Sequence, residues 1–319
     1  MTIAAFLALA AAGTSSALAV KNPTKSAKIF VNCPVNGFAA GLEEARPDLL
    51  CIFGATEPGE GGQFRVGKIT VPLSKQIVLQ YGAAIANEKE EEVINEKGEG
   101  TGGSTEYYIP PTHGAEAITP TPERVPGEPI ANITTTEQHE LGWPEPLMYS
   151  YGQAQKHGTV KRAYETIEQA GNPFTSIQYI LDGEKPGVVA PVKIKAENQW
   201  VSELGDACYV GSDAEPIVQH LTSGQSTSPL TSETIEGTKG EIGSVVHHGE
   251  FGMLYLTHSN LVDNTYAVPA ATCTGPYSSD IAAMINKQFE LPEPAGASVT
   301  ELKGTLYTGT KKFGEEGGA

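Results

Sequence analysis

Three histidines and a glutamate lie close together in the segment VVHHGEFGMLYLTH, residues 245–258. His247, His248, Glu250 and His258 would lie on two strands joined by a turn between Gly249 and Gly252, and nitrogen and oxygen ligands of this kind suit zinc or copper. Adjacent residues of a strand point to opposite faces, so only one of His247 and His248 could join a site. These four residues are therefore a weak metal candidate, and we expect neither a metal nor another cofactor.

The chain has four cysteines, Cys33, Cys51, Cys208 and Cys273. They form no C-x-x-C pair, and no histidine lies at zinc-finger spacing from them, which argues against a metal site built on sulfur. Four cysteines allow three disulfide pairings. We predict the sequential scheme, Cys33–Cys51 and Cys208–Cys273, because each bond then joins residues in one half of the chain. Cys208, in the segment GDACYVGSD, is therefore expected to be structural and not a nucleophile.

Motifs of catalysis are missing from the sequence. It contains no G-x-S-x-G, no H-E-x-x-H and no P-loop. A carboxylate pair of the glycosidase kind stays open as an alternative, because its two members need only meet in space. Six aromatic residues could stack on a sugar or fill the core: Trp143, Trp200, Tyr107, Tyr108, Tyr149 and Tyr151. The sequence identifies no catalytic residue and favours a non-catalytic protein over an enzyme.

Short apolar or alternating segments, separated by Pro, Gly and Asp, predict strands in both halves of the chain. They are KIFVNC, LLCIFG, QFRVGKITVPL and KQIVLQYG in the first half, and GVVAPVKIKAENQWV, ACYVGS, PIVQHLTSG, SVVHHGEFGMLYLTHSNLVDNTYAVPA and ASVTELKGTLYTG in the second. No internal repeat of 20 to 50 residues is evident, which argues against propellers and solenoids. The pattern predicts a mainly β protein, an antiparallel β-sandwich-like fold with one or two short helices.

Two segments have the spacing of helices. Residues 158–171, GTVKRAYETIEQAG, would place Val160, Tyr164 and Ile167 on one face. Residues 278–292, SSDIAAMINKQFELP, would begin at a serine cap, carry an apolar stripe that includes Ile281 and Met284, and stop before the proline.

An acidic segment rich in proline and glycine separates the two halves. From residue 82 to residue 146 there are thirteen glutamates against Lys89, Lys97 and Arg124. This density of proline and glycine disfavours a long helix or a central strand. We predict a single β-rich domain over residues 20–319, interrupted by an acidic insertion at 82–158, of which residues 88–146 are exposed and dispensable for folding.

The first 19 residues have the features of a secretory signal peptide. An apolar segment from Ile3 to Ala12 is followed by Ala17-Leu18-Ala19, the A-x-A pattern of a cleavage site, although no basic residue precedes the apolar segment. The remaining chain carries no stretch long enough to span a membrane. A net charge of −17 argues against nucleic acid as a partner, because that affinity comes chiefly from Lys and Arg. We therefore expect a secreted, extracellular protein.

Several segments together resemble a family of uncharacterised secreted, β-rich proteins of soil actinobacteria. They are CIFG, GKITVPLSKQIVLQYG, VVAPVKIKAEN, CYVGSDAEPIVQHLTSG, LVDNTYAVPAATCTG and LPEPAGASVTELKGTLY. The resemblance covers most of the chain outside the acidic segment. It implies secretion, a β-rich fold and paired cysteines, and it implies no activity for any residue.

Three classes of function remain at this point. We expect a non-catalytic protein at the cell exterior that is structural or binds a partner, such as a cell-surface polymer or another protein. The first alternative is a module that binds a carbohydrate or a small apolar ligand, which an apolar cavity or an aromatic strip would favour. The second is an exported hydrolase, which paired carboxylates or a Ser-His-Asp set in a cleft would favour.

Overall fold

The computed structural model describes part of the chain, and within it the fold is mainly β with antiparallel sheets, as predicted. The described residues are 49–56, 62–74, 78–86, 105–108, 121–171, 174–175, 177–203, 207–248 and 251–313. The predicted signal peptide at 1–19 lies outside them. None of the helices in these ranges has the length and apolar character needed to cross a membrane.

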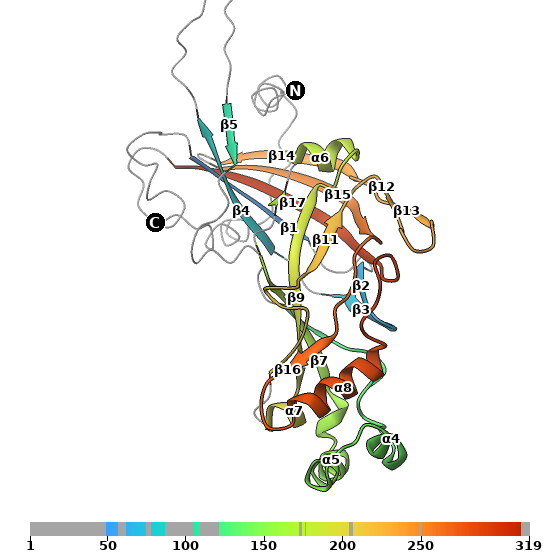
Figure 1. Cartoon of the computed structure of the whole chain (residues 1–319). Coiled ribbons are helices and arrows are strands. Elements are labelled where there is room, and N and C mark those ends of the chain that lie inside the picture. Colours follow the sequence, from blue (N-terminus) through green and yellow to red (C-terminus); the bar gives the residue numbers. More distant parts are fainter. Residues whose placement is uncertain are drawn as a thin grey trace, which may run out of the picture.

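One sheet has eight strands and lies at the upper end of the molecule (Figure 1). Its order is β14 (Glu241–His248), β15 (Phe251–Asp263), β17 (Thr300–Phe313), β1 (Leu49–Thr56), β4 (Val78–Ala86) and β5 (Thr105–Tyr108), with β2 (Gly62–Val66) on the start of β17 and β3 (Ile69–Leu73) on β2. The predicted histidine hairpin is therefore confirmed as the pair β14 and β15.

A second sheet has seven strands and extends from the first towards the helical end of the molecule (Figure 1). Its order is β16 (Ala271–Cys273), β10 (Cys208–Val210), β9 (Val188–Asn198), β7 (Ala163–Gln169) and β6 (Thr121–Arg124), while β11 (Ile217–Leu221) and β8 (Phe174–Thr175) also pair with β9. A small hairpin, β12 (Gln225–Thr227) and β13 (Thr234–Glu236), completes the strands in the described ranges. An isolated bridge between Thr222 and Val262 links the two large sheets.

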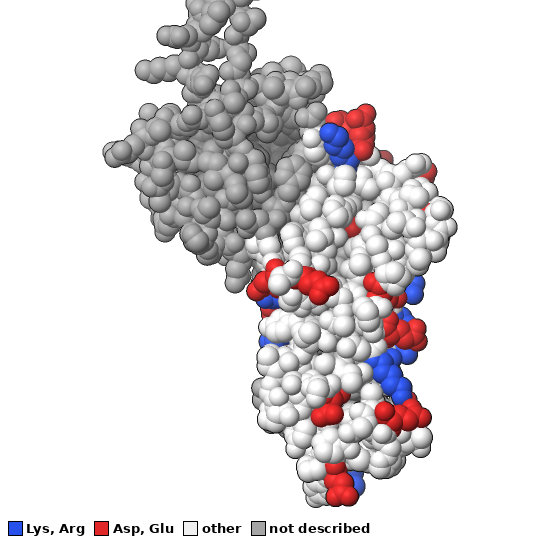
Figure 2. Space-filling model, viewed as in Figure 1, with Lys and Arg blue, Asp and Glu red and all other residues white. Residues whose placement is uncertain are grey.

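Strand β9 shows why the seven-stranded sheet has one dry face and one wet face. Along VVAPVKIKAEN, burial alternates as the sequence does: Val188, Ala190, Val192 and Ile194 are buried, and the residues between them are half-exposed. Successive side chains of a strand point to opposite faces, so the apolar set covers one face. On the face of the molecule in Figure 2, acidic and basic side chains are interspersed and do not form one patch.

Helix α8 (Ser278–Phe289) packs on the dry face of the seven-stranded sheet, at the end of the molecule where the helices lie. It confirms the second predicted helix. Its apolar stripe is buried: Ile281, Met284, Ile285 and Phe289. The residue at its N-cap is Tyr277, which makes no side-chain cap, so the predicted serine cap is wrong. The described ranges hold further helices α4 (Thr135–Glu140), α5 (Glu145–His157), α6 (Ile177–Asp182) and α7 (Gln199–Glu203), more than the one or two predicted.

The second half of the predicted insertion, residues 121–158, is packed structure, which corrects its boundary. Helix α4 begins with a complete capping box between Thr134 and Glu137. Trp143 and Tyr151 then pack with Trp200 of α7, with ring centroids 5.2 to 6.0 Å apart. The Tyr151 hydroxyl donates to the Ile130 carbonyl at 2.6 Å. Residues 121–158 therefore contribute buried side chains to the core and do not form an exposed loop, whereas residues 87–104 and 109–120 lie outside the described ranges.

The helix predicted over residues 158–171 is also wrong. A short 3-10 helix, Thr159–Lys161, leads instead into strand β7. Pairing with β9 along its whole length satisfies the backbone of this segment. Its helical spacing was therefore overridden by long-range strand pairing, because Ala163 and Glu165 of the same segment also fit the alternation of a strand.

Candidate functional site

Five residues form one row across the dry face of the seven-stranded sheet, which we call the inner row. Each is the register partner of the next: Cys273, Cys208, Ala196, Glu165 and Glu123, on β16, β10, β9, β7 and β6. Adjacent strands lie about 4.8 Å apart, so the row spans about 20 Å. A disulfide occupies one end of the row, two acidic residues occupy the other, and the small Ala196 separates them.

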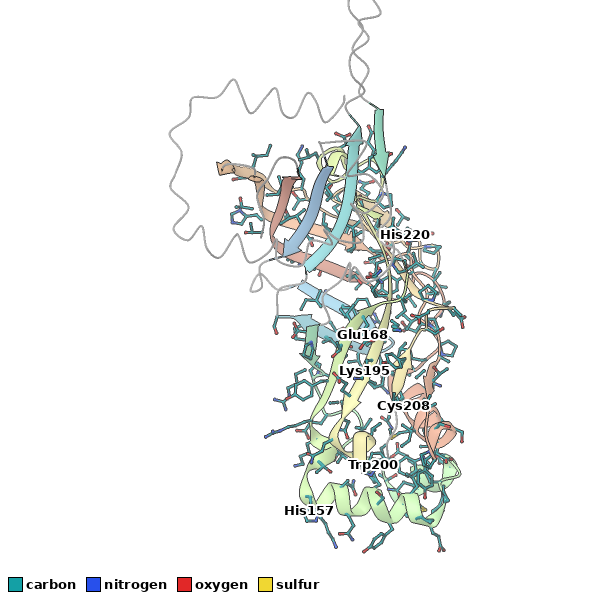
Figure 3. The ribbon with its side chains drawn as sticks, turned by 90° about the vertical axis from the view of Figure 1, so that its left-hand side faces the viewer. His157, Glu168, Lys195, Trp200, Cys208 and His220 are labelled. Atoms are coloured by element: carbon teal, nitrogen blue, oxygen red, sulfur yellow. A yellow bond between two sulfur atoms is a disulfide. The ribbon has the colours of Figure 1, made fainter. Side chains whose placement is uncertain are left out.

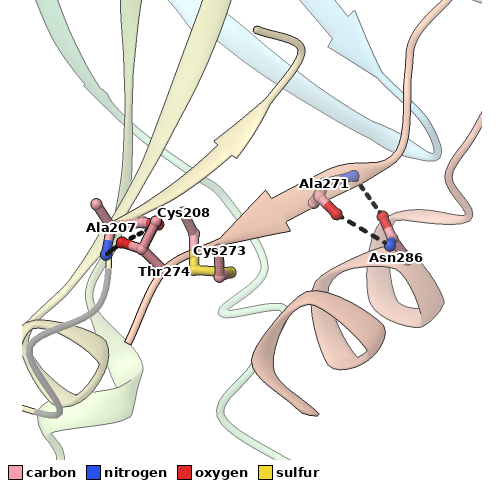
Figure 4. Close-up of a disulfide and its surroundings, with 6 residues drawn as sticks. All are labelled: Ala207, Cys208, Ala271, Cys273, Thr274 and Asn286. Carbon is pink, nitrogen blue, oxygen red and sulfur yellow. Dashed lines mark hydrogen bonds between the residues drawn. A yellow bond between two sulfur atoms is a disulfide. The ribbon is translucent and has the colours of Figure 1, made fainter. Parts of the chain in front are cut away.

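The disulfide end is rigid and closed. Cys208 and Cys273 are bonded, as predicted, with Cα atoms 4.0 Å apart, and Cys208 is fully buried (Figure 4). The Thr274 amide donates to the Ala207 carbonyl beside the bond, and the Asn286 amide group bonds both backbone groups of Ala271, which ties α8 to β16. The other predicted bond is not described, since Cys33 and the side chain of Cys51 lie outside the described residues.

At the acidic end, Glu123 is buried and held in place. It is 3 % exposed, and its carboxylate accepts two hydrogen bonds from Ser74, one from the backbone amide at 2.8 Å and one from the hydroxyl at 2.6 Å. Ser74 follows β3, so this contact fastens the β2–β3 hairpin to β6. Acceptance by both oxygens is the pattern of an ionised carboxylate.

Glu165 lies directly opposite Glu123 but lacks comparable partners. It is also 3 % exposed, and its Oε1 is buried without a hydrogen-bond partner. Burial, and after it the charge of Glu123, raises the pKa of Glu165 from an ordinary value near 4.5 to about 8. Glu165 is therefore mostly a neutral carboxylic acid at pH 7, and its Oε1 has no hydrogen-bond partner.

A small cavity of about 40 Å3 lies next to Glu165, between the sheet and α8. Its lining residues are Val66, Val125, Pro129, Ile130, Ala163, Tyr164, Glu165, Ile194, Ala196, Glu197, Asn198, Val201, Val210, Met284, Ile285 and Phe289. The space exists because Ala163 and Ala196 are small where the surrounding residues are large. One water needs about 10 to 15 Å3 on this measure, so the cavity has room for about three heavy atoms.

Two other polar residues of the lining, Asn198 and Glu197, already have hydrogen-bond partners. The amide of Asn198 donates to the Thr159 and Arg162 carbonyls, and its oxygen accepts from the Trp200 amide. The Glu197 carboxylate is held on the opposite, wet face of the sheet by the Thr166 hydroxyl at 2.6 Å and by Lys195 at 3.1 Å. Among the buried side-chain atoms of this lining, Glu165 Oε1 is therefore the one without a hydrogen-bond partner, and a bound molecule could satisfy it.

The strand register separates His258 from His247 and His248, the other histidines of the predicted metal candidate. His247 and His248 pair with Gly252 and Phe251 beside the turn, whereas His258 lies six residues farther along β15, where the register shifts. Six residues of strand span about 20 Å, so His258 does not face the other two histidines. Glu250 lies outside the described residues, and the described part of the chain contains no group of three His, Cys, Asp or Glu side chains that could hold a metal ion.

The aromatic candidates divide between core and surface. Trp143, Trp200 and Tyr151 are buried in the helical cluster, and Tyr149 is 70 % exposed on α5. The side chains of Tyr107 and Tyr108 are not described. Trp200 lies at the helical end of the molecule together with His157, while Glu168 and Lys195 lie between them and His220 (Figure 3). The aromatic candidates whose side chains are described form no exposed strip: Trp143, Trp200 and Tyr151 are buried, and Tyr149 is exposed.

The residues of this site were missed because the sequence places them in segments that we interpreted otherwise. Glu123 falls in the predicted insertion, and Glu165 in the predicted helix. One signal could have found Glu165: in AYETI, residues 163–167, it shares strand parity with Ala163 and Ile167. Comparisons with protein-family models, with curated proteins and with solved structures found no match to this chain.

Proposed function

We propose that the protein is a non-catalytic binding protein that acts outside the cell and holds a small, largely apolar molecule in the cavity beside Glu165. One observation carries the proposal: a buried carboxyl oxygen without a partner borders a cavity that is lined mostly by apolar side chains. Buried polar groups in proteins are nearly always satisfied, so an unsatisfied one beside open space points to an absent partner. Extracellular location is the expectation from the leader sequence and forms part of the proposal.

The size of the cavity limits the ligand. Three heavy atoms fit, and the best very small ligands gain about 1.5 kcal/mol per heavy atom. The dissociation constant is then about 0.5 mM at the tightest. A longer molecule could bind through a short terminal group of this size.

The alternative functions find less support at this site. Hydrolysis by two carboxylates needs room for a sugar ring, and Glu123 would have to give up two hydrogen bonds from Ser74 to act as base or nucleophile. Carbohydrate binding by stacking needs exposed aromatic faces, whereas Trp143, Trp200 and Tyr151 are each 4 % exposed or less.

The proposal is tested by titrating the protein with ethanol, a molecule of three heavy atoms, while observing the 13C-labelled methyl groups of its methionines. The Met284 methyl lines the cavity and should shift in a saturable manner, while Met148 on α5 serves as the reference. Ala196→Val places two further methyl groups in the cavity and should abolish the shift. Ala283→Val adds the same groups to the exposed side of α8 and should leave it unchanged.

Two results would contradict the proposal. The first is a Met284 signal that stays fixed up to 100 mM ethanol, roughly two hundred times the limiting dissociation constant. The second is an Ala196→Val variant that remains folded and still responds like the wild-type protein.

A further inference from the structure

The cavity also carries information about the chemical class of its ligand. We propose that it binds a primary alkylammonium group of about three heavy atoms, whose nitrogen donates to Glu165 Oε1 and whose carbon atoms contact Met284, Ile285 and Ala196. This inference rests on the proposed function and adds the charge of the ligand to it.

The first argument is the type of the unpartnered atom. A carboxyl oxygen in its ionised state is an acceptor only, so it is satisfied by a donor on the ligand. Ketones, ethers and esters offer acceptors alone, so they could pair only with the protonated form of Glu165 and would leave the ionised form unpaired. Amines and alcohols both carry donors, and charge decides between them.

The second argument is the charge that surrounds Glu165. The acidic group that faces it is Glu123, its register partner on β6, and the lining also contains Tyr164. From β9, Glu197 turns its carboxylate to Lys195 on the wet face. Helix α8 presents Met284, Ile285 and Phe289, β2 presents Val66, and α7 presents Val201. None of the lining residues within the described part of the chain is basic, so the cavity favours a cation over a neutral molecule of equal size.

The third argument is that the cavity offers one unpartnered buried polar atom, Glu165 Oε1. Asn198 and Glu197 already have hydrogen-bond partners, Tyr164 is 38 % exposed, and the other lining residues besides Glu165 are apolar. A ligand with two polar ends would leave one of them unpaired in an apolar wall, which costs affinity. A charged nitrogen at one end of a short alkyl chain matches one acceptor at one end of the cavity.

Binding of such a cation is coupled to loss of a proton. Glu165 is mostly protonated at neutral pH, so one proton leaves its carboxyl group for the solvent as each alkylammonium ion enters. The nitrogen keeps its own three protons, and no bond to carbon forms or breaks. Affinity should therefore rise about tenfold from pH 6 to pH 7, about fivefold from pH 7 to pH 8, and level off above pH 8, the raised pKa of Glu165. It should fall again only where the amine itself loses its proton, near pH 10.4.

The test compares ethylammonium chloride with ethanol, since both have three heavy atoms and only one carries a charge. The Met284 methyl signal is titrated with each at pH 6, 7, 8 and 9, at constant ionic strength. Ethylammonium should bind about fiftyfold more tightly at pH 8 than at pH 6, because about half of Glu165 is ionised at pH 8 and about one hundredth at pH 6. Ethanol should bind no more tightly at pH 8 than at pH 6.

Two variants of one strand give the matched control. Glu165→Gln should weaken ethylammonium binding at pH 8 at least tenfold and remove its pH dependence. Glu168→Gln changes a half-exposed glutamate three residues away on β7 and should bind like the wild-type protein. If Glu165→Gln fails to fold, Ala196→Val supplies the test instead, because it blocks the cavity and leaves Glu165 in place.

The outcomes separate this inference from the proposed function. Ethanol binding together with ethylammonium binding that is absent, or that ignores pH, overturns the ligand class and leaves the cavity as a binding site. Ethylammonium binding that survives Glu165→Gln unchanged likewise overturns the class. A Met284 signal that responds to neither molecule overturns the proposed function as well.

Discussion

Two neighbouring rows of residues cross the seven-stranded sheet, and they differ in almost every property. The inner row runs from Cys273 to Glu123. The outer row is one residue away on every strand: Thr272, Tyr209, Lys195, Thr166 and Pro122. The inner row is dry and holds a disulfide and two acids, while the outer row is partly wet and holds a lysine in a salt bridge.

Two glutamates on adjacent strands show what this difference teaches. Burial acts to raise the pKa of Glu197, but hydrogen bonds from Thr166 and Lys195 outweigh it, so the pKa lies below its usual range. Burial also raises the pKa of Glu165, where no such donor opposes it and the charge of Glu123 adds to the shift. Burial alone therefore does not set the pKa of a carboxyl group in this sheet. Whether hydrogen-bond donors reach the carboxylate decides the direction of the shift.

The largest expected effect concerns the disulfide end of the inner row. The double variant Cys208→Ala, Cys273→Ala should lower the free energy of unfolding by about 4 kcal/mol, because the bond closes a loop with a sequence separation of 65. Urea unfolding measures the loss. Thr272→Ala, on the exposed edge of the outer row, should change stability by less than about 0.5 kcal/mol.

A structural role for Cys208 also predicts that non-reducing peptide mapping finds it joined to Cys273. A titratable thiol at Cys208 in folded protein, or a double variant as stable as the wild type, would show that the inner row does not depend on this bond.

The second effect concerns the acidic end. Between about pH 4.5 and pH 8 the folded protein holds a proton on Glu165 that the unfolded chain has released, so each added pH unit favours unfolding by up to about 1.4 kcal/mol. This penalty is absent at low pH and fully developed above pH 8. Glu165→Gln should remove it, so the variant gains stability relative to the wild type as pH rises.

Glu168→Gln serves as the outer-face control for this measurement. Urea unfolding at pH 5, 6, 7 and 8 should give Glu168→Gln the same pH profile as the wild type. Parallel profiles for the wild type and Glu165→Gln would mean that Glu165 is ionised in the folded protein, and the contrast between the rows would fail.

The sequence predicted those parts of the fold whose signals are local. Strand β9 and helix α8 carry clean periods of two and 3.6 residues, and both form as predicted. The segment 158–171 fits both periods, and its choice of a strand depends on β9, a partner about 30 residues away. A local pattern contains no information about that partner.

The candidate site was harder to predict because it depends on register. Glu123 and Glu165 are 42 positions apart and meet because β6 and β7 pair with one particular alignment; a shift of one residue would turn one of them to the wet face. The pairing of Cys208 with Cys273 was predictable because four cysteines allow few choices. The cavity was not, since it reflects the absence of side-chain volume above Ala163 and Ala196.

The smallest expected effect lies on the outer row and sharpens the contrast through salt. Lys195 and Glu197 are 35 % and 36 % exposed, and an exposed pair of this kind contributes about 0.2 to 1 kcal/mol. A double-mutant cycle with Lys195→Met and Glu197→Gln should give a coupling energy in that range at 0.05 M salt and a value near zero at 1 M salt, because the Debye length falls to about 3 Å. The pH slope that Glu165 contributes should persist at 1 M salt, since burial and not a screened surface charge is the main cause of its raised pKa. Two results together would contradict the contrast between the rows: a pH slope from Glu165 that vanishes at 1 M salt, and a Lys195–Glu197 coupling energy that does not. They would mean that the charge of the inner row is screened by solvent and that of the outer row is not.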